Sequence, residues 1–298
     1  MKIVNTFMPF VAFLLFVSCG GKDKEYDATG TFEATEVTVS AEQNGRLLSL
    51  DVDEGNIVEA GRQVGVVDTV QLYLKALQIG AAKNVYAYQR PDVKKQVAAT
   101  RQQLEKARQE QARFKALVAD GAANKKLLDD ATSQVAVLKR QLDALISQLS
   151  TSTNSLNAQM GRADIEREQV ADQLRKCHIA SPISGTVLEK YAEQGEYAVV
   201  GKPLFKVADI KNMYLRAYVT SQQLKSVRIG QPVAVFADYG GEARKEYRGR
   251  VSWISSKAEF TPKTILTDDE RADLVYALKV AVKNDGMIKI GMYGEVRF

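Results

Sequence analysis

The sequence predicts a mixed multidomain fold: a β domain split in two by an inserted α-helical coiled-coil hairpin, followed by a small antiparallel β barrel. Three observations lead to this prediction. A short glycine-punctuated β pattern occurs twice, at residues 45–61 and 185–201. A long segment rich in Ala, Gln, Lys, Glu and Leu separates the copies, and strand-like segments with Gly and Pro turns fill the rest of the chain.

The first segment, residues 1–18, is expected to be a signal peptide. Lys2 precedes an apolar run at residues 7–17, which is shorter than the about 20 residues that a membrane-spanning helix needs. Small residues and Cys19 follow, and this order resembles the lipobox of bacterial lipoproteins, in which the cysteine is acylated. We therefore expect lipidation at Cys19 and a polar tether over residues 19–29; the alternatives are an ordinary secretory signal or a short anchor.

Composition restricts the possible function classes. The net charge of +5 is too diffuse to indicate a nucleic-acid partner. With one histidine, His178, and with Cys177 the only cysteine besides Cys19, we expect no disulfide, metal centre, cofactor or histidine-based catalytic triad. A basic cluster is either an exposed strand face or a surface for acidic headgroups or a membrane partner; it consists of Arg244, Lys245, Arg248 and Arg250.

The two β copies are expected to form one domain. Residues 30–69 hold a strand that leads into the barrel and the first half, and residues 177–210 hold the second half. Neither half is long enough to bury a core alone, so the halves should fold against each other. The pattern resembles a biotinyl/lipoyl-type domain, in which a carrier lysine lies on the turn between the halves. Here residues 68–70 read Asp-Thr-Val, which disfavours a carrier function.

The inserted segment, residues 70–176, shows heptad spacing. Its apolar positions step by four and three residues on both sides of a short turn at residues 120–124, which predicts an antiparallel hairpin. Pro91 in one arm and the polar run STSTNS from Ser150 in the other predict a joint in both arms. A dimerisation coiled coil is the alternative reading.

Residues 211–298 contain five strand signals and are expected to form the small barrel. The strand-like residues 30–39 are a candidate for a further barrel strand. Trp253, in the segment YRGRVSWIS, is expected in the barrel core rather than in a ligand site.

Taken together, these segments resemble the periplasmic adaptor proteins, also called membrane fusion proteins of the haemolysin-D type. The most specific matches are IASPISGTV at residues 179–187 and the closing GMYGEVRF at residues 291–298. The resemblance implies a non-enzymatic periplasmic protein, lipid-anchored to the inner membrane. It would act as a ring of six copies that links an inner-membrane exporter to an outer-membrane channel.

The resemblance also implies a docking site. In this family the hairpin tip binds the channel through an Arg, a Leu four residues later and a Ser seven residues after that. Arg113, Leu117 and Asn124 hold this spacing, with Asn in place of Ser. The alternative is that Arg113 is a solvated helix residue and Leu117 part of the coiled-coil seam.

The pump class is indicated by residues 259–280, which resemble the barrel loop of adaptors that accompany ATP-driven, ABC-type exporters. An ABC permease with its ATPase is thus the expected inner-membrane partner. The alternatives are an adaptor of a proton-driven efflux pump and an envelope-tethering lipoprotein without a role in transport.

Overall fold

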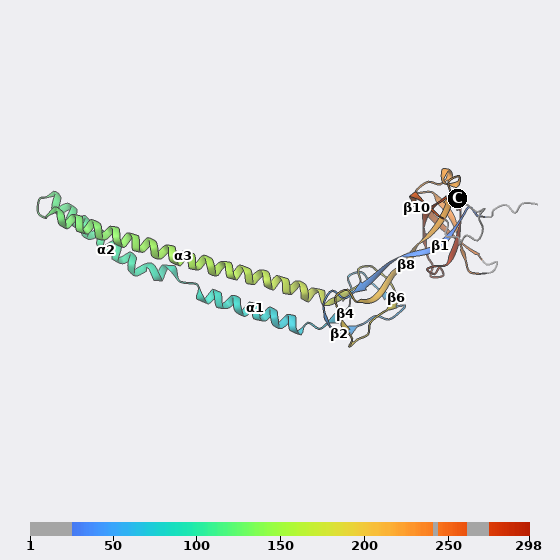
Figure 1. Ribbon diagram of the computed structural model, residues 1–298, viewed down its shortest axis with the longest axis horizontal. Coiled ribbons are helices and arrows are strands. Elements are labelled where there is room, and N and C mark those ends of the chain that lie inside the picture. The colour runs from blue at the N-terminus through green and yellow to red at the C-terminus, as the bar shows by residue number, and fades with distance from the viewer. Residues whose placement is uncertain (1–25, 241–243, 261–273) are drawn as a thin grey trace, which may run out of the picture.

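The computed structural model describes residues 26–240, 244–260 and 274–298, so the expected signal peptide and Cys19 lie outside the described residues. The molecule is elongated (Figure 1), with a helical hairpin at one end, a β barrel at the other and the split β domain between them. The predicted fold class is confirmed.

Six short strands and the ends of two long ones build the split β domain. They are β2 (Gly45–Leu50), β3 (Ile57–Val58), β4 (Gln63–Val67), β5 (His178–Ala180), β6 (Gly185–Lys190) and β7 (Tyr197–Ala198), with parts of β1 (Ala28–Ser40) and β8 (Pro203–Thr220). The halves exchange their shortest strands: β3 of the first half pairs with β6 of the second, and β7 of the second pairs with β2 of the first.

Equivalent hydrogen bonds join the two halves. The Gly55 amide donates to the Val187 carbonyl at 2.9 Å, and its counterpart Gly195 donates to the Leu47 carbonyl at 2.8 Å. Both glycines have φ near +90°, at +88° and +92°, where a side chain would be strained. Because each half is completed by the other, the long insertion between them leaves their common core closed.

The core of the split domain is apolar and draws on both halves. Its fully buried side chains include Leu47, Val67, Leu204, Phe205 and Val207. The alternating apolar positions of the short strands supply these residues, as expected for strands with one buried face.

The insertion forms three helices: α1 (Val70–Gln89), α2 (Val93–Ala119) and α3 (Lys125–Lys176). The first arm breaks at Pro91, and the Asp92 carboxylate caps α2 by accepting a hydrogen bond from the Lys95 amide at 3.1 Å. Along α2 and α3 the heptad seam is buried; it comprises Val97, Leu104, Leu138, Leu142 and Leu149.

The joint expected near Ser150 in the returning arm is absent, because α3 runs uninterrupted from Lys125 to Lys176. The Thr153 hydroxyl donates to the Leu149 carbonyl at 2.8 Å, which satisfies it inside the helix. Leu149 and Leu156 on either side remain buried in the seam. Packing therefore overrides the low helix propensity of this polar run.

The barrel closes with six strands in the order β1-β12-β9-β10-β11-β8, and β8 pairs back to β1. The later strands are β9 (Pro232–Asp238), β10 (Arg244–Phe260), β11 (Leu274–Lys283) and β12 (Tyr293–Arg297), and the short helix η1 (Gln223–Ser226) precedes β9. Thus β1 is the further strand that the sequence suggested. Phe32, Leu215 and Leu278 are fully buried in the barrel core.

The expectation for Trp253 is wrong, since its side chain is 42% exposed. The pairing of β10 with β11 shifts between Val251 and Trp253, which marks a β-bulge at Ser252. A bulge changes which face the following residues point to. Trp253 therefore faces outward, and Ile254 packs against the core in its place.

Candidate functional site: the hairpin tip and the domain junction

The hairpin tip lies at the end of the molecule opposite the barrel (Figure 1). Gly121 makes the turn with φ +69°, and the Ala122 amide donates to the Leu117 carbonyl at 2.8 Å. Asn124 begins the returning arm as the cap of α3, where its side-chain oxygen accepts from the Lys126 amide at 3.0 Å. This cap gives Asn124 a structural role that a serine could also fill.

Arg113 and Leu117 lie one helical turn apart on α2, hence on the same face of the helix. The Arg113 guanidinium contacts the Glu110 carboxylate at 2.7 Å and remains mostly exposed. Leu117 is 37% exposed, while its neighbours Phe114 and Val118 occupy the half-buried positions. The three expected docking residues thus belong to one end of the hairpin and are all accessible.

A polar contact across the tip was not anticipated. The Gln111 amide donates to the Thr132 hydroxyl at 3.1 Å, and that hydroxyl donates to the Leu128 carbonyl at 2.8 Å. Gln111 occupies a heptad position that is usually apolar. A polar residue there was the signal in the sequence for a hydrogen bond between the arms. The contact links the two arms close to the turn.

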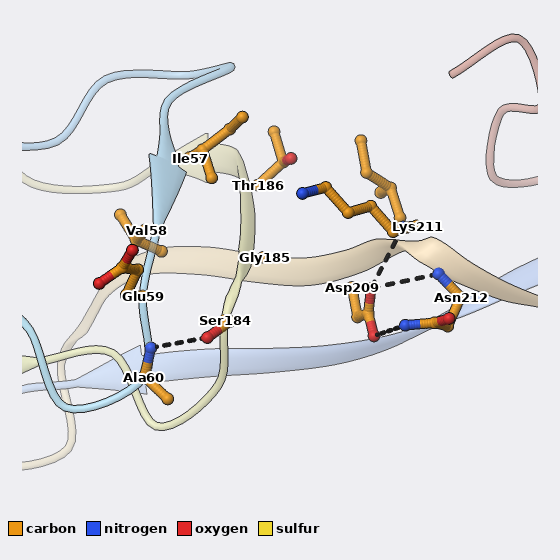
Figure 2. A pocket seen from close by; sticks show the side chains of 11 residues that line it. Ile57, Val58, Glu59, Ala60, Ser184, Gly185, Thr186, Asp209, Lys211 and Asn212 are labelled. Atoms are coloured by element: carbon orange, nitrogen blue, oxygen red, sulfur yellow. Dashed lines mark hydrogen bonds between the residues drawn. The ribbon is translucent and has the colours of Figure 1, made fainter. Parts of the chain in front are cut away.

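The second candidate region is the junction between the split domain and the barrel. Strands β1 and β8 run through both, but Thr35 pairs with Asp209 whereas Ala34 pairs with Met213. Residues 210–212 of β8 therefore form an excursion that leaves β1 at the junction, and Asn212 pairs instead with Lys283 of β11. The Asp209 carboxylate holds it by accepting from the amides of Lys211 and Asn212 at 3.1 and 3.2 Å (Figure 2).

Asn284, at the end of β11, fastens the excursion from the barrel side. Its amide nitrogen donates to the carbonyls of Ile210 and Ile288 at 2.8 and 2.9 Å, and its backbone amide donates to the Lys211 carbonyl at 2.9 Å. Asp209 and Asn284 together fix the path of β8 between the two β domains. No sequence pattern indicated this pair.

A groove of about 520 Å³ opens beside this excursion (Figure 2). The side chains of Glu59, Lys211 and Asn212 line it together with the exposed Ile57. Two hydroxyl residues, Ser184 and Thr186, also line it, and Ser184 accepts a hydrogen bond from the Ala60 amide at 2.9 Å. The groove is thus a feature of the joint between the two β domains.

Cys177 and His178 do not form a site. Cys177 is fully buried, burial raises the pKa of its thiol, and the thiol donates to the Gln173 carbonyl at 3.4 Å. His178 is exposed on β5. Within the described part of the chain, no group of three or more His, Cys, Asp or Glu side chains could hold a metal ion.

The basic cluster on β10 is partly neutralised. Arg244 contacts the Glu295 carboxylate at 2.7 Å and lies over the Tyr26 ring, and Lys245 is hydrogen-bonded to the Asp285 carboxylate. The hydrogen bond from Lys245 is the main reason that the pKa of Asp285 is lowered to about 2.

In residues 26–240, 244–260 and 274–298, no helix combines the length and the apolar character that crossing a bilayer requires.

Comparisons with known proteins agree with this architecture. A family model described as the RND MFP barrel-sandwich hybrid domain matches residues 35–210. The membrane protein YbhG of Salmonella gallinarum is 28% identical over 293 residues, covering 90% of this chain and 87% of that protein.

Two solved structures share the fold. MacA from Actinobacillus actinomycetemcomitans gives a TM-score of 0.54 at 21% identity, covering 91% of this chain and 76% of its own. A MacA-MexA chimeric protein, containing the Pseudomonas aeruginosa MexA α-hairpin domain, gives 0.50 at 22% identity over 90% of this chain and 78% of its own.

Proposed function

The chain belongs to the membrane fusion proteins, the periplasmic adaptors of tripartite efflux systems, and on this premise we propose that it links an ABC-type exporter to an outer-membrane channel. Members of the family work with inner-membrane transporters and outer-membrane channels and form oligomers, and the family is a non-enzymatic class. The observation that carries the proposal is the hairpin, which projects away from the barrel (Figure 1).

The length of the hairpin supports the bridging role. Helix α3 has 52 residues. At about 1.5 Å rise per residue, such a helix reaches roughly 80 Å from the split domain. We propose that Arg113, Leu117 and Asn124 at its tip bind the channel, with the exposed guanidinium of Arg113 donating to acidic or carbonyl groups there.

The outer face of α1 supports assembly of copies side by side. This helix buries no residue, and several of its large apolar side chains are exposed. The exposed stripe consists of Val70, Leu74, Leu77, Val85 and Tyr88. An apolar stripe of this kind is typical of a face covered in an assembly, and we propose a ring of six copies.

The ABC-type partner and the lipid anchor rest on sequence resemblance. Most of residues 259–280, the segment similar to adaptors of ABC exporters, lies outside the described residues, as does Cys19. We propose acylation of Cys19 and attachment to the inner membrane. Cys19→Ser should then release the protein into the soluble periplasmic fraction, whereas its persistence in membranes would contradict the lipid anchor.

The test of the adaptor role is crosslinking in intact cells, purification of the tagged protein and mass spectrometry of its partners. We expect an ABC permease, its ATPase and an outer-membrane channel. A proton-driven pump would overturn the pump class, and recovery of no transporter would favour the envelope-tethering alternative.

The docking residues are tested in the same assay. Arg113→Glu should abolish recovery of the channel while recovery of the inner-membrane partner is kept. Arg101→Glu, on the same helix but away from the tip, is the matched control. Undiminished channel recovery with Arg113→Glu would refute the docking role.

A further inference from the structure

The barrel end farthest from the split domain exposes two large apolar side chains. We call it the far end and define it by Asp27, residues 223–231 and residues 250–253. Ile229 is 68% exposed and Trp253 is 42% exposed. Two backbone hydrogen bonds hold their segments together: the Gly230 amide donates to the Val251 carbonyl at 2.8 Å, and the Val251 amide donates to the Gln231 carbonyl at 3.0 Å.

The direction of β10 assigns these residues to the far end. Near its start, Lys245 contacts Asp285, which directly follows the junction residue Asn284. From there β10 runs away from the junction, and at Val251 it reaches the loop that follows η1. That loop comes after Thr220, the last residue of β8, which itself leads away from the split domain.

Basic side chains surround the two apolar ones. The Arg250 guanidinium donates to the Gly230 carbonyl at 2.6 Å, which holds it next to Ile229. Lys225 and Arg228 are exposed on η1 and the following loop. Among the residues that the structure describes, no carboxylate forms an ion pair with Lys225, Arg228 or Arg250, in contrast to Arg244 and Lys245 on the same sheet.

The chain also joins the barrel at this end. The Asp27 carbonyl accepts a hydrogen bond from the Gln223 side chain, and the Asp27 carboxylate accepts one from the Phe298 amide at 2.8 Å. The first described strand therefore begins at this end of the barrel, beside η1.

We propose that the far end binds the surface of an anionic phospholipid leaflet, with Ile229 and Trp253 in the headgroup layer and Lys225, Arg228 and Arg250 at the phosphates. Tryptophan favours this layer because its ring is apolar and its N–H can still find a polar partner. Basic side chains add electrostatic attraction to anionic lipid. This goes beyond the proposed function, because neither the adaptor role nor a lipid anchor requires the barrel itself to touch the bilayer.

The binding would fix the orientation of the barrel. A lipid on a polar tether holds only the N-terminus, whereas two apolar contacts and three basic ones on a rigid barrel also restrict its tilt. The hairpin, which leaves the other side of the molecule, would then point away from the membrane (Figure 1).

Trp253 makes the proposal directly measurable, because it is the single tryptophan of the chain. The full-length protein is reconstituted in vesicles of phosphatidylcholine alone or with phosphatidylglycerol, and the emission of Trp253 is recorded. We expect a blue shift and quenching by lipids brominated near the headgroup in the anionic vesicles, and a smaller effect in the zwitterionic ones. Emission that stays water-like in both would overturn the proposal.

A pair of charge reversals tests the basic side chains. Lys225→Glu with Arg228→Glu should reduce the quenching in anionic vesicles at least twofold. The matched control is Lys106→Glu with Lys115→Glu, two exposed residues of α2, and should leave it unchanged. Equal quenching in both double variants would refute the role of these charges.

The assay separates this proposal from the proposed function, since the vesicles contain neither transporter nor channel. If Trp253 stays exposed to water in anionic vesicles and its emission changes only after an inner-membrane transporter is added, the far end is a protein-binding surface. The membrane proposal would then fail while the adaptor role stands.

Discussion

The β domains and the helical hairpin of this molecule are stabilised in different ways. In the β domains, large side chains such as Phe32, Leu47 and Phe205 are fully removed from solvent between strands that are distant in sequence. In the hairpin, α1 buries no side chain and α2 buries two, Val97 and Leu104. The comparison shows that the part that gives the molecule its reach has the thinnest core.

The difference follows from geometry. A closed barrel or a two-sheet domain encloses its core on all sides, whereas two antiparallel helices can cover only one seam and leave the rest of each helix to solvent. The hairpin is therefore expected to open locally at lower free energy than the β domains unfold.

Leu47→Ala should be the most damaging of these changes, because it leaves a cavity in the closed core of the split domain. We expect a loss of about 3–5 kcal/mol in the free energy of unfolding, measured by urea denaturation. Leu48→Ala, at the neighbouring position where the side chain is 45% exposed, is the matched control and should cost little. Similar losses for both variants would contradict the closed core.

Leu142→Ala removes a seam residue of the hairpin and should cost about 2 kcal/mol, less than a comparable change in the β domains. The effect should be local: hydrogen exchange should accelerate in α2 and the facing part of α3 but not in the barrel. Ile146→Ala, more exposed on the same helix, serves as the control. Faster exchange throughout the protein would mean that the hairpin and the β domains unfold together.

Asp285→Asn should weaken the barrel in a pH-dependent way. The folded-state pKa of Asp285 is lowered to about 2, so its contribution is complete above the unfolded-state pKa near 4 and is lost as the pH falls toward 2. The variant should be less stable than the wild type at pH 7, and the two melting curves should converge near pH 2. A constant difference down to pH 2 would contradict this account, and Asp129→Asn on the hairpin is the control.

Lys83→Ala should have the smallest effect. The ammonium of Lys83 contacts the Asp164 carboxylate at 2.7 Å between α1 and α3, but the two side chains are 32% and 42% exposed. We expect a coupling of about 0.5 kcal/mol in a double-mutant cycle with Asp164→Ala, reduced by salt. A coupling several times larger would show that this ion pair, rather than apolar packing, holds α1 against α3.

The sequence was most informative where local signals repeat. The glycine pattern predicted the split domain because a tight turn with positive φ, as at Gly55, favours glycine, and the repeated glycines are therefore visible in the sequence. The heptads predicted the hairpin for a similar reason. Sequence reasoning failed where one extra residue shifts the strand pairing. The alternation of apolar and polar residues in β10 does not indicate the bulge at Ser252, which turns Trp253 outward.

The candidate sites divide in the same way. The spacing of Arg113 and Leu117 is visible in the sequence because both lie on one helix. The joint role of Asp209 and Asn284 at the junction is invisible in the sequence. Asp209 holds the three-residue excursion of β8 through backbone amides, and Asn284 holds it from the end of β11 through backbone carbonyls. The docking role of the tip residues and the lipidation of Cys19 stay predictions.

The pairing of β1 also governs the order in which the molecule can fold. Ala28 lies opposite Val296, so the first strand of the barrel finds one of its neighbours only when the end of the chain is available. The hairpin depends on contacts between nearby segments and can form early, whereas the barrel must wait. Until then β1 presents an unpaired edge, and the interval between the emergence of β1 and of β12 is when the chain is most vulnerable to aggregation and proteolysis.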